Sequence, residues 1–181
     1  QADIGRLTIE DNTGTSTVVP IATPDIDPLL NVYTEPEGVS GPQEITVTMD
    51  QATASQSQRA RIYLQSFSVA ALNIEEVCIV NGNGDCVAGQ QDDSGLFRLC
   101  NGDPEVSNGC ADVNVPGPLG FEDSHVASIF FAPRPDTAGR TNARIKITSN
   151  DSTRPNYLIV VRGEVCSRNI DGDVCGDCGN G

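Results

Sequence analysis

The fold is decided by residues 126–164, which read VASIFFAPRPDTAGRTNARIKITSNDSTRPNYLIVVRGE. Apolar and polar residues alternate over residues 143–148, the pattern of a β-strand with one face in a core and the other in water. Residues 150–155 then favour a turn, and residues 157–161 form an unbroken apolar run. A further apolar segment precedes the loop rich in proline and glycine. The stretch therefore predicts three consecutive strands.

The apolar run at residues 157–161 carries a further expectation. A strand that is apolar on both faces must be covered on both, so we expect this strand to lie between two layers and to end at Arg162 and Gly163. Short strands joined by turns at this spacing indicate an antiparallel β-sandwich. The fold class predicted is therefore all-β.

The same stretch resembles a known family. The residues that carry the resemblance are Phe131-Ala132-Pro133, Gly139, the ARIKITSND segment at 143–151, Pro155, and the apolar strand closed by Arg162 and Gly163. They are similar to the carboxy-terminal half of Ig-like domains of the ASPM/SPD-2/Hydin type. A weaker match upstream extends the resemblance to about residues 43–165. It implies a seven-strand sandwich that serves as a scaffold or interaction module, with no catalytic residues to carry over.

The chain departs from that family in a cysteine-bearing insertion at residues 81–118. Alternating segments at residues 45–49, 59–65 and 72–79 supply earlier strands, the last with a bulge at Glu75-Glu76. A strand near Phe97 is the expected seventh.

The amino-terminal part is predicted to lie outside the sandwich. Residues 1–10 have the pattern of a strand, with Leu7 and Ile9 on one face and Ile4 out of phase across Gly5, as a β-bulge gives. Residues 20–42 hold five of the eleven prolines and show no periodicity, which indicates an extended connector. The expected organisation is a strand and connector over 1–42, a sandwich over 43–165 and a tail over 166–181.

Composition limits the partners and the compartment. The net charge of −14 repels phosphate backbones, so nucleic acid is not expected as a partner. No apolar run reaches the length of a membrane span. Seven cysteines beside a single histidine indicate disulfides, and therefore an extracellular or cell-surface location.

The cysteines divide into two groups. Cys78 and Cys86 flank an Asn/Gly turn, and Cys100 and Cys110 flank a second loop, so we expect two local disulfides, although spacing alone leaves other connectivities open. The tail holds Cys166, Cys175 and Cys178. One of the seven is then left over, and either a bond to another chain or a partner cysteine beyond this sequence would account for it.

The acidic tail suits a hard cation. Carboxylate and amide oxygens spaced among glycines can fold around calcium, and the candidate ligands are Asn169, Asp171, Asp173 and Asp177. The glycine is misplaced for an EF-hand and no bidentate glutamate follows, so a solvated acidic turn stays open as the alternative. For the cysteines of the tail, a redox dithiol, structural zinc and covalent haem all fit less well than a disulfide.

Catalysis has little support in the sequence. The sole histidine, His125, lies beside a strand with no activated-serine signature, so no catalytic residues are expected. Asn150 opens a glycosylation sequon at the expected turn before residue 156.

Three functions remain open. The favoured one is a non-catalytic structural or assembly protein at the cell surface, of the kind that forms a pilus-like filament. Its amino-terminal strand, with Ile4, Leu7 and Ile9, would add to the sheet of another copy and build a homopolymer. The alternative is an adhesion or ligand-binding module of a larger surface protein, with residues 81–118 as the contact loop. A secreted enzyme ranks third.

Overall fold

The computed structural model describes residues 3–10, 13–14, 16–22, 27–35, 41, 44–50, 57–105, 110–115, 117–134 and 139–166. These residues form ten strands and the short 3-10 helix η2 (Ala88–Gln90). The strands are β1 (Asp3–Glu10), β2 (Ser16–Ala22), β3 (Leu30–Glu35), β4 (Glu44–Asp50), β5 (Gln58–Ser66), β6 (Ile74–Val80), β7 (Phe97–Asn101), β8 (Ser124–Phe131), β9 (Gly139–Ser149) and β10 (Asn156–Cys166).

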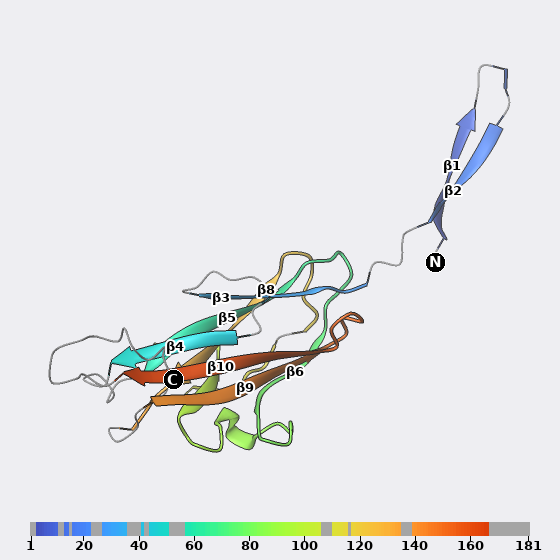
Figure 1. Cartoon of the computed structure of the whole chain (residues 1–181). Helices are drawn as coiled ribbons and strands as arrows, with labels where there is room; N and C mark the ends of the chain where they lie inside the picture. Colours follow the sequence, from blue (N-terminus) through green and yellow to red (C-terminus); the bar gives the residue numbers. More distant parts are fainter. Residues whose placement is uncertain are drawn as a thin grey trace.

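Eight of these strands form two sheets that face each other (Figure 1). One sheet has the order β3-β5-β8-β7 and the other β4-β10-β9-β6. The first order matches the ABED sheet of an Ig-like sandwich, and β6, β9 and β10 match its CFG sheet. The prediction of an Ig-like β-sandwich is confirmed, with one difference: β4 pairs with β10 in parallel, so the second sheet is mixed.

The core lies between the sheets and is built by alternation along each strand. In β5 the buried residues are Ala60, Ile62 and Leu64, and the residues between them are only partly buried. The same alternation in β9 buries residues 143, 145 and 147, as the sequence predicts. Phe97 of β7 and Phe131 of β8 stack with ring centroids 4.9 Å apart and complete the core at the other sheet.

The prediction of an extended connector over residues 20–42 is wrong for Leu30–Glu35, which form strand β3. Leu30, Val32 and Thr34 are buried, and β3 pairs along its whole length with β5. The alternation of apolar and polar residues in β3 is hard to recognise in the sequence because one of its three core positions is a threonine. The sandwich therefore begins at Leu30, upstream of the expected boundary at 43.

The predictions for residues 157–163 also need correction. Tyr157, Ile159 and Val161 face the core, but Leu158 is 51% exposed on the outer face of the sheet, so the strand is not covered on both faces within the described chain. The strand also continues past Gly163 to Cys166. Gly163 is buried within β10 because the Phe131 ring fills the space beside it.

Both predicted bulges are confirmed. The register of β1 shifts between Asp3 and Gly5, and that of β6 shifts between Ile74 and Glu76. A strand is also present at Phe97, as expected. β1 pairs with β2 in a separate two-stranded sheet, which Figure 1 shows apart from the sandwich.

Candidate functional site

The amino-terminal hairpin is the first candidate for an interaction site. Leu7 pairs with Val19, and Gly5 with Ile21, so these positions share one face of the hairpin with position 9. Positions 6, 8 and 10 lie on the opposite face because side chains alternate along a strand. The register thus gives the hairpin one mostly apolar face. A two-stranded hairpin of this kind is at best marginally stable alone in water.

The two edges of the hairpin differ. Pro20 lies within β2, opposite Arg6. Proline cannot donate a ladder hydrogen bond, and within sheets it occurs on edge strands. An added strand would therefore pair beside β1, which contains the predicted partner-strand residues Ile4, Leu7 and Ile9. Their pairing with another copy remains a prediction.

The edges of the sandwich at β6 and β7 are occupied. Val87 N donates to Ile79 O at 2.9 Å beside β6, and Asp92 N donates to Phe97 O at 3.1 Å beside β7. Asn101 at the end of β7 also binds the backbone of the segment that follows it, where Asn101 N donates to Ala111 O at 2.9 Å. Neither edge can therefore take a full additional strand without displacing these segments.

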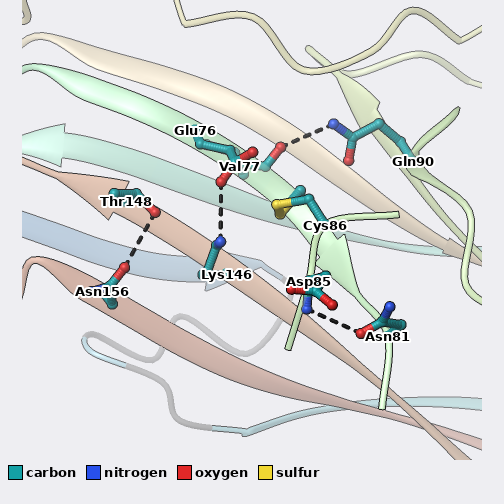
Figure 2. The surroundings of a disulfide bond; sticks show 10 residues. Glu76, Val77, Asn81, Asp85, Cys86, Gln90, Lys146, Thr148 and Asn156 are labelled. Carbon is teal, nitrogen blue, oxygen red and sulfur yellow. Dashed lines mark hydrogen bonds and ion pairs between the residues drawn. A yellow bond between two sulfur atoms is a disulfide. The ribbon is translucent and has the colours of Figure 1, made fainter. Parts of the chain in front are cut away.

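Disulfides fasten the same segments. Cys78 pairs with Cys86, with Cα atoms 5.6 Å apart, and Cys100 pairs with Cys110, with Cα atoms 5.2 Å apart, as the sequence predicts. Figure 2 shows the surroundings of the first bridge, where Gln90 Nε2 donates to Val77 O at 3.0 Å. Two disulfides are typical of proteins outside the reducing cytoplasm.

The turn before Cys86 explains the first bridge. Asn81 Oδ1 accepts hydrogen bonds from Asn83 N at 2.9 Å and from Asp85 N at 3.0 Å, the second of which is drawn in Figure 2. Gly84 takes the left-handed conformation that the turn requires, with φ of 89°. The side chain of Asn81 thus folds the chain back so that Cys86 meets β6.

The opposite side of the sandwich is more open. At β3, Gly41 N donates to Val32 O at 2.6 Å and so occupies one position of that edge. β4 pairs with β10 on one side, and within the described residues no strand pairs on its other side. An edge with unpaired backbone groups is a template for another strand. Within the described residues β4 therefore offers an acceptor edge, and β3 offers a second one that Gly41 occupies at one position.

Asp151 anchors β3 to the turn between β9 and β10. Its side chain is fully buried, and its Oδ2 accepts a hydrogen bond from Leu30 N at 3.0 Å. Its Oδ1 accepts from Thr153 N at 2.8 Å, Thr153 Oγ1 at 2.6 Å and Arg154 N at 3.1 Å. Burial raises the pKa of Asp151, but these hydrogen bonds outweigh burial and leave the pKa below its ordinary value.

Charged residues cover the outer face of the β3-β5-β8-β7 sheet. Arg59 Nη1 lies 2.7 Å and Arg61 Nε 2.9 Å from the carboxylate of Asp103, and Tyr63 donates to Glu35 at 2.9 Å. The hydrogen bond from Arg61 lowers the pKa of Asp103. The contacts of Arg59 and Arg61 hold the segment after β7 against the sheet, and the bond between Tyr63 and Glu35 joins β5 to β3.

A groove with both polar and apolar lining lies at the other sheet. It has a volume of about 530 Å³ and is lined by the loop at 92–94, the turn after β6 and the start of β9, with Asp93, Asn81, Asn142 and Arg144 among its residues. Asp92 is engaged in the fold, because its carboxylate accepts from Phe97 N at 2.7 Å and from Ser94 N at 3.2 Å. Amide, carboxylate and guanidinium groups therefore face a common space.

His125 is half-buried and has a structural partner. Its Nε2 donates to Asn101 Oδ1 at 2.9 Å, and burial lowers its pKa. The same oxygen of Asn101 accepts from Asn114 N at 3.4 Å. This pair links β8 to the segment that follows β7, and Nε2 of the imidazole bonds an amide oxygen rather than a serine hydroxyl.

Asn150 uses its side chain within the fold. Its Oδ1 accepts from Asn73 N at 2.8 Å, and its Nδ2 donates to Ala71 O at 3.2 Å. A glycan on Nδ2 would compete with the second bond, and glycosylation there remains a prediction.

The predicted tail site lies outside the described residues. This holds for Asn169, Asp171, Asp173, Asp177, Cys175 and Cys178. Cys166 ends β10, but its side chain is also outside the described part. Calcium binding and the fate of the remaining cysteines therefore stay predictions.

Comparison with known proteins gives only distant structural likenesses. No protein-family model matches the chain, and no curated protein does. Solved structures with a similar fold include a Porphyromonas gingivalis W83 protein of unknown function, with 11% identity and a TM-score of 0.49, which covers 91% of this chain and 68% of that chain. Another is the ASH/PapD-like domain 7 of human CEP192, with 14% identity and a TM-score of 0.41, which covers 86% of this chain and 96% of that chain. A third is the periplasmic chaperone SfaE, with 8% identity and a TM-score of 0.41, which covers 74% of this chain and 56% of that chain.

These likenesses are too distant to give a function, and the Ig-like assignment rests on the strand order of this chain. Among the described residues there is no helix with the length and apolar character that crossing a membrane requires.

Proposed function

We propose that this chain is a non-catalytic structural subunit of the cell surface, an Ig-like module of the ASPM/SPD-2/Hydin type that joins other copies of itself by strand addition. In this proposal β1 of one copy pairs with the open β4 edge of the next, and repetition of the contact builds an extracellular filament.

The observation that carries the proposal is the hairpin, which pairs with no further strand among the described residues. β1 and β2 form a sheet of their own, with apolar residues at positions 7, 9, 19 and 21 on one face. Three or more strands, or packing against another element, are needed for a hairpin to be stable. Pairing with a second copy supplies both a third strand and a cover for the apolar face.

The closed edges at β6 and β7 also support an assembly role. The chain closes β6 and β7 with hydrogen-bonded segments that two disulfides fasten, and closed edges do not aggregate. The β4 edge is left for a specific contact. Closing β6 and β7 removes two of the four sandwich edges and so reduces the number of possible modes of association.

Removal of the hairpin tests the proposal. A chain lacking residues 1–22 should keep its sandwich and stay monomeric under conditions in which the intact chain forms higher assemblies. Sedimentation velocity and negative-stain electron microscopy measure this, and far-UV circular dichroism reports the fold. Assembly of the truncated chain to the same extent as the intact chain would refute strand addition.

A matched pair of variants tests the face of the hairpin. Leu7→Asn with Ile9→Asn removes apolar groups from the face that should be buried, and assembly should be lost. Arg6→Asn with Thr8→Asn changes the opposite face, and assembly should persist. Equal behaviour of the two double variants would contradict an interface on the apolar face.

The groove supports the second candidate, a ligand-binding module. Its lining combines the polar groups of Asn81, Asp93 and Asn142 with apolar surface, which is suited to a small ligand that carries polar groups. Asn142→Ala and Asp93→Ala should then abolish binding to such a ligand and leave the oligomeric state unchanged, whereas the hairpin variants should do the reverse.

A further inference from the structure

One end of the sandwich exposes large apolar side chains. The group, which we call the end surface, consists of Leu29, Phe67, Val69 and Phe121, with exposed fractions of 38%, 60%, 70% and 54%. Two of the five phenylalanines of the chain are thus in water at one end of the molecule. Apolar groups gathered in this way mark interaction sites more often than scattered single residues do.

Backbone hydrogen bonds hold the end surface together. Phe67 N donates to Leu29 O at 3.0 Å, which joins the segment before β3 to the end of β5. Ser66 N donates to Asp123 O, and Glu122 N to Ser66 O, both at 3.0 Å, which joins β5 to the turn that carries Phe121. The exposed side chains therefore come from neighbouring, fixed backbone, and such a preorganised surface loses little entropy on binding.

The turn that presents Phe121 is strained. Asp123 N donates to Gly120 O at 3.0 Å across the turn, and Gly120 N donates to Asp123 Oδ2 at 2.8 Å. Glu122 has φ of 65°, a left-handed conformation that a residue with a Cβ rarely adopts. Strained backbone of this kind occurs often at binding sites, and here it lies next to the exposed Phe121.

The hairpin leaves the sandwich at this same end. Only seven residues, 23–29, separate β2 from β3, and Leu29 belongs to the end surface. Ser152 Oγ donates to Asp27 Oδ2 at 2.8 Å and fastens this segment to the turn between β9 and β10. A segment of seven residues spans about 25 Å at most, so anything that binds the hairpin must come close to the end surface.

We propose that the end surface packs against the neighbouring copy that receives the hairpin. This inference rests on the proposed function and extends it: the contact between copies consists of an added strand and a second, apolar patch next to it. The occupant is another copy because the short tether brings the copy bound to the hairpin to this end.

Serine substitutions on the end surface test the proposal. Phe67→Ser and Phe121→Ser should each weaken association at least about tenfold, since burial of one phenylalanine side chain contributes that much or more. Both residues are exposed, so the melting of the monomer should hardly change. Sedimentation velocity over a concentration series gives the association constant.

Two controls distinguish a specific contact through the end surface from nonspecific hydrophobic association. Phe67→Leu and Phe121→Leu keep the surface apolar and should retain most of the association. Leu158→Ser removes an equally exposed apolar side chain from the outer face of the β4-β10-β9-β6 sheet and should leave association unchanged. A loss in Leu158→Ser as large as that in Phe67→Ser would overturn the inference.

The chain without residues 1–22 distinguishes the two proposals. If that chain is monomeric and the serine variants associate as tightly as the intact protein, strand addition stands and the end-surface contact is refuted. If that chain associates like the intact protein, the proposed function fails and the inference fails with it. Weakened association in the serine variants, together with a monomeric truncated chain, supports both.

Discussion

Gly163→Ala should destabilise the sandwich through one contact between its two sheets. A Cβ at position 163 would lie 2.6 Å from both Cδ2 and Cζ of Phe131, and still closer to Cε2. Carbon atoms in contact are about 3.5–4 Å apart, so the ring would have to move by about 1 Å. Phe131 is fully buried and stacks on Phe97, which leaves it little room.

The magnitude follows from two opposing effects. Overpacking of a core costs about 1–3 kcal/mol, and this overlap with a buried ring belongs in the upper half of that range. Replacement of glycine by alanine restricts the unfolded chain and returns about 0.4–1 kcal/mol. We expect a net loss of about 2 kcal/mol in the free energy of unfolding, which for a chain of this size lowers the Tm by about 4–8 °C.

Urea titration followed by far-UV circular dichroism measures the loss, with the disulfides kept oxidised; the chain has no tryptophan to serve as a fluorescent probe. Gly82→Ala is the matched control, because nothing lies within 4 Å of its added Cβ, and its stability should be unchanged or slightly higher. Phe131→Leu should partly rescue Gly163→Ala, with a coupling energy of about 1 kcal/mol. Strict additivity of the two substitutions, or a stable Gly163→Ala protein, would refute the reasoning.

Three further predictions concern other parts of the fold. Asp151→Asn should lower the free energy of unfolding by about 1–3 kcal/mol in urea titration, because the buried carboxylate accepts four hydrogen bonds. Since the folded pKa of Asp151 is depressed, its stabilisation is complete above the unfolded pKa of about 4 and is lost as the pH falls through the folded pKa; a pH series should show this loss in the native protein and not in the variant. Removal of the first bridge by Cys78→Ala with Cys86→Ala should cost about 2.5 kcal/mol by the loop-entropy relation, measured in the same titration. Glu122→Gly should raise the Tm slightly. Relief of the left-handed backbone stabilises the folded state by about 1–2 kcal/mol, and the larger conformational entropy that glycine loses on folding cancels part of this gain.

Local patterns predicted those parts of the fold in which neighbouring residues decide the structure. The alternation in β9 requires only that one face of the strand be buried, and the Asn/Gly turn before Cys86 closes through the side chain of Asn81 itself. The bulge at Gly5 was visible as a shift of phase within one strand. In each case the deciding contacts lie within a few residues.

Other parts depend on contacts between distant residues. β3 is held by its pairing with β5 and by the hydrogen bond from Leu30 N to Asp151, 121 positions away, and no local pattern predicts these contacts. The continuation of β10 through Gly163 depends on a ring from the other sheet. The exposure of Phe67 and Phe121 could not be predicted either, since an apolar residue next to a predicted strand is ordinarily assigned to the core.

The asymmetry of the molecule determines what kind of assembly strand addition can produce. The proposed donor, β1, and the proposed acceptor edge, β4, are different surfaces of the chain, so a single contact between them is heterologous. Such a contact leaves one free hairpin and one free edge at the two ends of every pair, and growth continues unless a ring closes. The smallest ring is a two-fold dimer in which β1 of each copy pairs with β4 of the other. Sedimentation that ends at a discrete dimer in which both hairpins are protected from proteolysis would therefore contradict growth into a filament, whereas a ladder of increasing sizes with one hairpin accessible per assembly agrees with it.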